Sequence, residues 1–135
     1  MTIYIGWRYN SITEDDITVY DIIGGEFMPE SIERGALTEA VFYILLSLFT
    51  PMHGYGIMQN VSKLSSSRVN LGAGTLYGAI NTLLEKNWIK SVDGDKNQRK
   101  KEYEITELGK SMVEDEIIRL QELIDNGRKI VGGEI

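Results

Sequence analysis

A group of positively charged side chains in the second half of the sequence is well suited to bind phosphate groups. Its members are Lys96, Arg99, Lys100 and Lys101. The whole chain has a net charge of −6, but residues 36–105 carry 8 basic and 6 acidic side chains, whereas the segments before and after them are acidic. Contact with DNA needs a local basic surface and not a basic chain. The alternative interpretation of this run is a solvated surface loop.

Three polar side chains lie in residues 73–86, a segment whose apolar residues recur at helical spacing, and the last of them follows the second by one turn on the same face. They are Thr75, Tyr77 and Asn81. Hydroxyl groups can bond to phosphates or base edges, and an Asn amide can form two hydrogen bonds with adenine. The first N–H groups of the helix would add donors for phosphate. The pattern therefore predicts contact with DNA, although Gly74-Thr75-Leu76-Tyr77 taken alone is equally typical of an ordinary helix start.

The sequence lacks the residues that most catalytic and metal sites need. It has no cysteine and a single histidine, His53, which is expected to cap a helix. Gly54-Tyr55-Gly56 and Gly72-Ala73-Gly74 do not continue as dinucleotide-binding motifs. We therefore expect no cofactor, no metal and no enzymatic activity. No secretory signal is visible, and the apolar run at residues 40–49 is too short for a membrane span of about 20 residues, so we expect a soluble, cytoplasmic protein.

The elements that would position these residues follow from apolar spacing and from chain breakers. Helices are expected at residues 36–49, 54–64, 73–86 and from 107 to about 125 or beyond, and strands at 88–92 and 99–105. Pro51 ends the first helix, Asn87 ends the third, and Thr106 caps the last. Three helices, a hairpin and a long helix predict a mainly α fold with a winged helix-turn-helix. The third helix would enter the major groove, and the hairpin would form the wing, with Trp88 in its core.

Apolar residues of the last helix form a seam at heptad spacing. They are Val113, Ile117, Leu120 and Ile124, followed one heptad later by Val131. Such a seam is suited to pairing with another helix. The first helix is apolar nearly all round, so it needs cover on several sides. We therefore expect the first four seam residues to form a homodimer interface, the alternative being that the seam packs within its own domain.

Several short motifs occur in a fixed order between about residues 36 and 110. They are Leu37-Thr38-Glu39, Pro51-Met52-His53-Gly54-Tyr55, Gly74-Thr75-Leu76-Tyr77, Leu84-Glu85-Lys86-Asn87-Trp88-Ile89, Arg99-Lys100-Lys101-Glu102-Tyr103-Glu104-Ile105-Thr106 and Glu107-Leu108-Gly109. Together they resemble the PadR family of bacterial transcription regulators, and the single long last helix is similar to its short subfamily. Gly72-Ala73 stands where the family often has Ser-Pro, and Asn87 stands for a usual Gly; both departures preserve the expected backbone.

The resemblance implies a homodimeric DNA-binding regulator, usually a repressor, that recognises an inverted repeat. It also implies dimerisation through the last and first helices, and release from DNA by small ligands such as phenolic acids or drug-like aromatic compounds. Phe42, Met112 and Glu116 are candidates to contact such an effector between the last helix of one subunit and the first helix of the other. Some members stack ligands on a Trp of the last helix; this helix has none, which argues against that mode.

The main alternative function is a winged-helix module that binds another protein and not DNA. The acidic net charge supports this alternative. The basic run Arg99-Lys100-Lys101 argues against it, unless the partner is acidic.

The sequence divides into three predicted parts: an N-terminal extension at 1–35, a winged-helix domain at 36–106 and a dimerisation helix at 107–135. Alternating apolar residues at 3–9 and 17–20 are typical of a β-hairpin. Alternatively, Met28 is the natural start, since Gly24-Gly25-Glu26 can be encoded by purine-rich codons that resemble a ribosome-binding site. In either case we expect residues 1–27 to be dispensable for DNA binding.

Overall fold

The computed structural model describes residues 36–92 and 101–133. Its elements are α3 (Glu39–Ser47), β1 (Met52–His53), α4 (Gly54–Leu64), α5 (Ala73–Glu85), β2 (Ile89–Val92), β3 (Glu102–Ile105) and α6 (Glu107–Val131). This order confirms the predicted mainly α fold with a small β wing. The predicted N-terminal hairpin lies outside the described residues, as do Lys96, Arg99 and Lys100.

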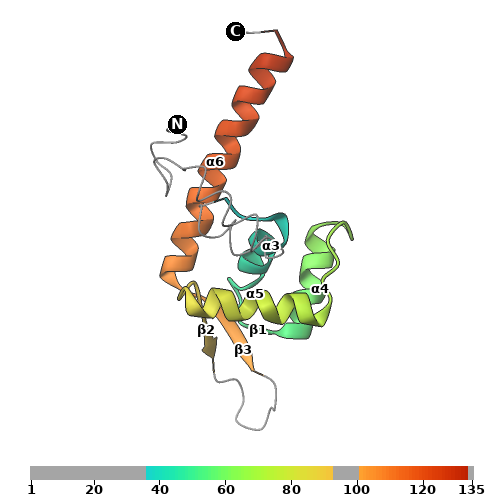
Figure 1. The fold of residues 1–135 in the computed structure, drawn as a ribbon, viewed down its shortest axis with the longest axis vertical. Helices are drawn as coiled ribbons and strands as arrows, with labels where there is room; N and C mark the ends of the chain where they lie inside the picture. Colours follow the sequence, from blue (N-terminus) through green and yellow to red (C-terminus); the bar gives the residue numbers. More distant parts are fainter. Residues whose placement is uncertain (1–35, 93–100, 134–135) are drawn as a thin grey trace, which may run out of the picture.

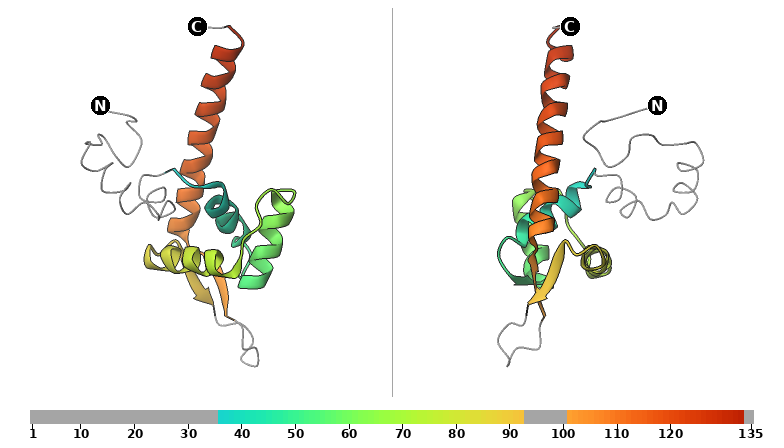
Figure 2. Two further views of the ribbon diagram at one scale, coloured as in Figure 1. Left: turned by 45° about the vertical axis from the view of Figure 1, so that its right-hand side comes forward. Right: turned by 90° about the vertical axis from the view of Figure 1, so that its left-hand side faces the viewer.

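The short helices and the sheet form one body, from which α6 rises as a long rod (Figure 1). The C-terminal half of α6 extends beyond the rest of the described chain, and α5 lies across the direction of α6 near its base (Figure 2). Within residues 36–92 and 101–133, none of the helices is long and apolar enough to cross a membrane.

The wing is a sheet of three antiparallel strands in the order β1-β3-β2. Ile89 of β2 pairs with Ile105 of β3, and Met52 of β1 pairs with Tyr103. Strand β1 was not predicted, because its 2 residues are too few to show the alternation by which a strand is recognised. This short strand joins the start of α4 to the wing.

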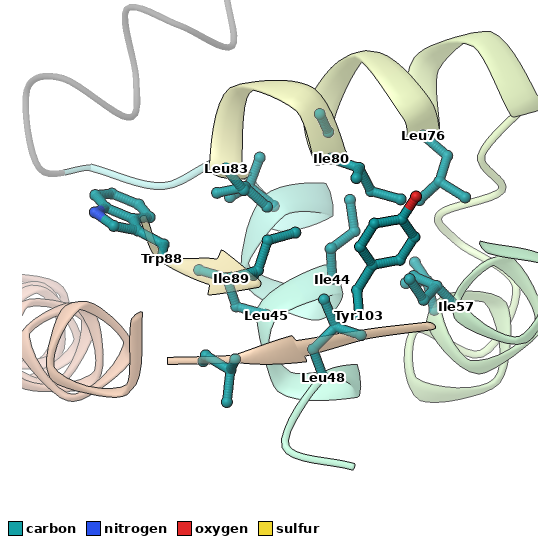
Figure 3. Close-up of a cluster of buried hydrophobic side chains, with 14 of the residues drawn as sticks. Ile44, Leu45, Leu48, Ile57, Leu76, Ile80, Leu83, Trp88, Ile89 and Tyr103 are labelled. Atoms are coloured by element: carbon teal, nitrogen blue, oxygen red, sulfur yellow. The ribbon is translucent and has the colours of Figure 1, made fainter. Parts of the chain in front are cut away.

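A shared apolar core holds α5 against the other elements (Figure 3). Leu76, Ile80 and Leu83 point into it from α5. The partners from α3, α4, β2 and β3 are Ile44, Leu45, Leu48, Ile57, Ile89 and Tyr103. Trp88 is also buried in this core, as predicted. Full burial of each such aliphatic side chain contributes roughly 1.5–3 kcal/mol, so the core determines which side of α5 faces outward.

Helix α3 is shorter than predicted, and the chain itself covers most of its apolar surface. Thr38 accepts a hydrogen bond from the N–H of Val41 and caps the helix, which therefore begins at Glu39. Its buried residues are Val41, Ile44, Leu45 and Ser47. Helices α4 and α6 both pack against α3. The remaining large apolar residues of α3 are Phe42, Tyr43 and Leu46, which are only partly buried, and the exposed Phe49 lies just beyond the helix end.

The predicted N-caps are confirmed. His53 accepts a hydrogen bond at Nδ1 from the N–H of Gly56 at 3.1 Å, and Thr106 accepts one from the N–H of Gly109 at 3.0 Å. Each cap satisfies one of the N–H groups that the first turn of a helix leaves without an intrahelical partner. The lone histidine thus has a structural role.

A residue in the left-handed region follows the C-terminal cap of both α4 and α5. Asn87, at φ 62°, follows α5 as predicted, and Ser66, at φ 53°, follows α4. After α4, the N–H of Ser66 bonds to the carbonyl of Lys63 at 3.2 Å, and the N–H of Ser67 bonds to that of Ser62 at 2.7 Å. This pair of bonds is the Schellman motif, in which glycine usually occupies the position of Ser66.

Candidate nucleic-acid interface

Helix α5 has one buried and one exposed side. The buried side consists of Leu76, Ala79, Ile80 and Leu83, each at most 2% exposed. The exposed side includes Thr75, Tyr77, Gly78 and Asn81. The three polar residues predicted to contact DNA from this helix therefore share one surface, and the contact itself stays a prediction.

The N-terminus of α5 opens onto the same surface. Gly72 is the N-cap and makes no side-chain hydrogen bond, and residues 72–75 are exposed. The first turn contains no acidic residue. Its backbone N–H groups and the positive end of the helix dipole are therefore suited to a phosphate group.

Gly78 lies in the middle of the exposed side. A β-carbon at this position would have nothing within 4 Å in the described chain. Glycine in a helix interior is about 1 kcal/mol less favourable than alanine, so the fold does not explain this residue. The absence of a side chain lets the backbone of α5 approach another surface closely at this point.

The side chain of Tyr77 also contacts the first residue of α4. A β-carbon at Gly54 would lie 2.8 Å from Cζ of Tyr77 and closer still to its hydroxyl oxygen. Tyr77 is nevertheless 44% exposed. Burial, with a smaller contribution from Tyr77, raises the pKa of Tyr103 in β3. Tyr77 therefore lies where α4, α5 and β3 meet.

Two further exposed side chains on neighbouring elements were not predicted as contacts. Tyr55 directly follows Gly54 and is 57% exposed. Lys90 is exposed on β2, next to the buried Ile89. The sequence did contain a signal for Lys90, because the alternation of apolar Ile89 and charged Lys90 in a short strand indicates that Lys90 faces outward. No sequence signal distinguished Tyr55 from an aromatic residue of the core.

The positive charges on the wing are only partly within the described chain. Lys101 is exposed directly before β3, whereas the other three predicted wing contacts lie at 93–100, outside the described residues.

Arg68 is a basic residue outside the wing and is paired within the chain, because its Nε donates to Oε1 of Glu39 at 2.6 Å. This hydrogen bond, and then the charge of Glu39, raise the pKa of Arg68. Arg68 therefore ties the α4–α5 loop to the start of α3.

The predicted seam of α6 divides between the core and the surface. Val113 is 2% exposed and belongs to the core of its own chain, whereas Ile117 and Ile124 are 50% and 46% exposed and Leu120 is half-buried. The helix continues to Val131, so it includes the seam residue predicted one heptad after Ile124. The described chain thus covers the first part of the seam and leaves the later part open, on the half of α6 that projects from the body (Figure 1).

The three predicted effector-binding residues lie near the junction of α3 and α6. Phe42 and Met112 are half-buried against the core. Glu116 is 2% exposed, and its carboxylate accepts hydrogen bonds from the N–H of Leu37 at 3.0 Å and from Arg119 at 2.6 Å. Contact of these residues with an effector stays a prediction, and Glu116 already has partners within the chain.

Known proteins share this fold and part of this sequence. A family model described as the transcriptional regulator PadR-like family matches residues 42–115. The structure is similar to a PadR family transcriptional regulator from Eggerthella lenta DSM 2243, with a TM-score of 0.55 and 19% identity over 90% of this chain and 94% of that chain. It is also similar to a transcriptional regulator from Clostridium thermocellum, with a TM-score of 0.52 and 21% identity over 84% of this chain and 96% of that chain.

A third similar structure is a PadR family transcription regulator from Clostridium difficile R20291. Its TM-score is 0.51, with 26% identity over 67% of this chain and 96% of that chain. No curated protein matches the sequence.

Proposed function

Because the chain belongs to the PadR-like family of transcriptional regulators, we propose that it is a repressor that binds an inverted repeat in DNA as a homodimer. Membership of this family makes the chain a regulator and not an enzyme. The division of α5 carries the proposal, since its apolar side is buried and its polar side, with Thr75, Tyr77 and Asn81, is open. A helix whose apolar side packs against its own domain in this way can place its polar side in a major groove.

Two kinds of contact are proposed at this surface. Asn81 is suited to read an adenine, while Thr75 and Tyr77 are suited to bond to phosphates or base edges. The wing would contribute positive charges that neutralise phosphates, from Lys96, Arg99, Lys100 and Lys101. Each phosphate neutralised should steepen the dependence of log K on log salt by about 0.9.

The projecting half of α6 supports the homodimer. Ile117, Leu120 and Ile124 continue the apolar seam beyond the point where the body of the chain covers it. Pairing of two copies along this half would remove these side chains from water. Two recognition helices could then enter successive major grooves, about 34 Å apart.

We further propose that a small aromatic effector binds between α6 of one copy and α3 of the other, near Phe42 and Met112, with Glu116 at the same junction. Such a ligand would change the distance between the two recognition helices. It releases DNA only if it binds the dimer with the DNA-binding distance and the dimer with the altered distance with different affinities. The proposal includes a cytoplasmic location, because bacterial DNA lies there.

The proposal is tested by selection of binding sites from a pool of randomised duplexes, followed by fluorescence anisotropy at several salt concentrations. We expect one enriched inverted repeat. Asn81→Ala should weaken binding to it by about 1–3 kcal/mol, and Lys100→Ala/Lys101→Ala should reduce the salt slope by about 2. Glu114→Ala, at an exposed position of α6, is the control and should bind unchanged. A selection that enriches no site would contradict the proposal and favour the protein-binding module.

A further inference from the structure

The buried side chain of Glu116 connects α6 to the segment that precedes α3. Its Oε2 accepts a hydrogen bond from the N–H of Leu37 at 3.0 Å, and these residues are 79 positions apart in the sequence. Arg119, one turn further along α6, donates to both carboxylate oxygens at 2.6 Å. Glu116 is 2% exposed, so both connections are shielded from water.

Stability alone does not explain this arrangement. The desolvation penalty of a buried ion pair largely offsets its attraction, and apolar residues of similar volume are often as stable. An apolar side chain at Glu116 could not accept the hydrogen bond from Leu37, whose N–H lies outside α3. A hydrogen bond is directional, so what the carboxylate adds is a defined position of α6 relative to α3.

Helix α6 is also held at a second place, near its start. The hydroxyl of Thr106 donates to the carbonyl of Asn87 at 2.7 Å, and its N–H donates to the carbonyl of Trp88 at 2.9 Å. Gly109 lies against the carbonyl of Trp88, and a β-carbon there would lie 2.7 Å from Cγ1 of Ile105. Because Asn87 and Trp88 directly follow α5, this contact joins α6 to the recognition helix.

The two places of contact, with the apolar packing of Val113 between them, define the direction of α6. Gly109 and Glu116 are two helical turns apart, about 10 Å along the axis. A rod held at two points has a defined direction, whereas a rod held at one point can pivot. Ile124 lies about 12 Å beyond Glu116, so a small rotation at the junction moves the projecting half by a larger distance.

We propose that Glu116 is a positioning residue that sets the distance between the two recognition helices of a dimer. With Arg119 and the N–H of Leu37, it fixes the direction of α6 relative to α5. It thereby determines which separation of DNA half-sites the dimer accepts, and not which bases each half-site contains. This inference rests on the proposed homodimer.

The distance between the two copies of α5 can be measured directly. The sequence has no cysteine, so Glu85→Cys at the exposed end of α5 provides one spin-label site per copy. Pulsed electron paramagnetic resonance on the full chain without DNA then gives the distribution of distances between the labels. We expect a narrow distribution in the labelled parent. Glu116→Met, which cannot accept from Leu37 or pair with Arg119, should shift or broaden it.

Two further variants distinguish positioning from general destabilisation. Glu116→Gln keeps an oxygen that can accept from Leu37, so its distribution should lie between those of the parent and Glu116→Met. Glu114→Gln makes the same change of charge at an exposed position and should leave the distribution unchanged. If Glu116→Met does not fold, as judged by circular dichroism, Glu116→Gln carries the test, and a distribution identical to the parent overturns the inference.

An unchanged distribution in a folded Glu116→Met protein overturns the positioning role and leaves the proposed function standing. A parent without any distance between copies overturns both, because both require the dimer. The distance measurement is made without DNA. If the binding-site selection enriches no site, the proposed function is overturned and the result of the distance measurement still stands. Where a site is enriched, Glu116→Met should shift the preferred half-site separation and leave the affinity for one isolated half-site unchanged.

Discussion

The ring of Tyr77 lies against Gly54, and this contact joins the exposed side of α5 to the start of α4. Gly54 is the buried first residue of α4, directly after the cap His53. A β-carbon at Gly54 would lie 2.8 Å from Cζ of Tyr77, a separation that real β-carbons essentially never show. Gly54 in one helix thus leaves the space that is occupied by the ring of Tyr77, which is proposed to contact DNA from the other helix.

Substitution of Gly54 is therefore expected to affect binding more than stability. Gly54→Ala should change the free energy of unfolding by less than about 1 kcal/mol, because the atoms in the way are the tip of the Tyr77 side chain, which is 44% exposed and can move. It should also weaken DNA binding, because Tyr77 must move. Urea unfolding and anisotropy measure the two effects. Gly56→Ala is the control, since its nearest contact would be 3.6 Å; an equal loss in both variants would argue against the specific contact.

Gly78 should show opposite effects on stability and on binding. Gly78→Ala places a methyl group in open space and should raise the free energy of unfolding by about 0.5–1 kcal/mol. The same methyl group should weaken binding to the selected DNA site, because it separates α5 from the groove. Thermal unfolding and anisotropy, with Glu114→Ala as the control for binding, test this. Unimpaired binding by a stabilised variant would show that close approach at Gly78 is not needed.

The left-handed conformation of Ser66 predicts a stabilising substitution. A residue with a β-carbon in this conformation costs roughly 1–2 kcal/mol, and glycine avoids that cost but loses more entropy on folding. Ser66→Gly should therefore give a net gain of about 0.5–1 kcal/mol. Ser111→Gly, the same exchange inside α6, should instead lower stability by about 0.5 kcal/mol. Chemical denaturation of both proteins shows whether the effect comes from the left-handed conformation of Ser66 or from the exchange of Ser for Gly itself. Equal losses of stability in the two variants would contradict the prediction.

The exposed seam of α6 predicts a change of oligomeric state. Ile124→Glu places a charge on the projecting part of the seam and should convert the proposed dimer into a folded monomer, because 46% exposure already makes this position tolerant in one chain. Analytical ultracentrifugation measures the change. Ile118→Glu is the matched control, since Ile118 is 67% exposed and lies away from the seam. Dimers that persist in Ile124→Glu would place the interface elsewhere.

Tyr103 predicts a loss of stability at alkaline pH. Burial raises its pKa above the ordinary value of 10.0, so the folded chain holds the phenolic proton more tightly than the unfolded chain. The resulting stability is fully present below the ordinary pKa and is lost as the pH rises through the raised one. Urea unfolding at about pH 8 and about pH 11 should show a smaller loss for Tyr103→Phe than for the parent. Tyr55→Phe, at a 57% exposed site, should follow the parent.

Local features of the fold were accessible from the sequence, because each depends on residues within one or two turns of one another. The caps His53 and Thr106 and the left-handed Asn87 are of this kind. The helical period also placed Tyr77 and Asn81 on one face without reference to any distant residue. Boundaries were less accurate, since α3 begins only after its cap Thr38 and already ends at Ser47.

Features that depend on which distant segments meet required the tertiary structure. Periodicity groups Val113 with Ile117, but only the packing of α6 on the body decides that Val113 is buried and Ile117 half exposed. Strand β1 exists because the wing folds back beside it, and Glu116 has its partner Leu37 79 positions away. The physical reason is that a repeat along one helix determines which side chains share a face, whereas the burial of that face depends on long-range contacts that no local pattern encodes.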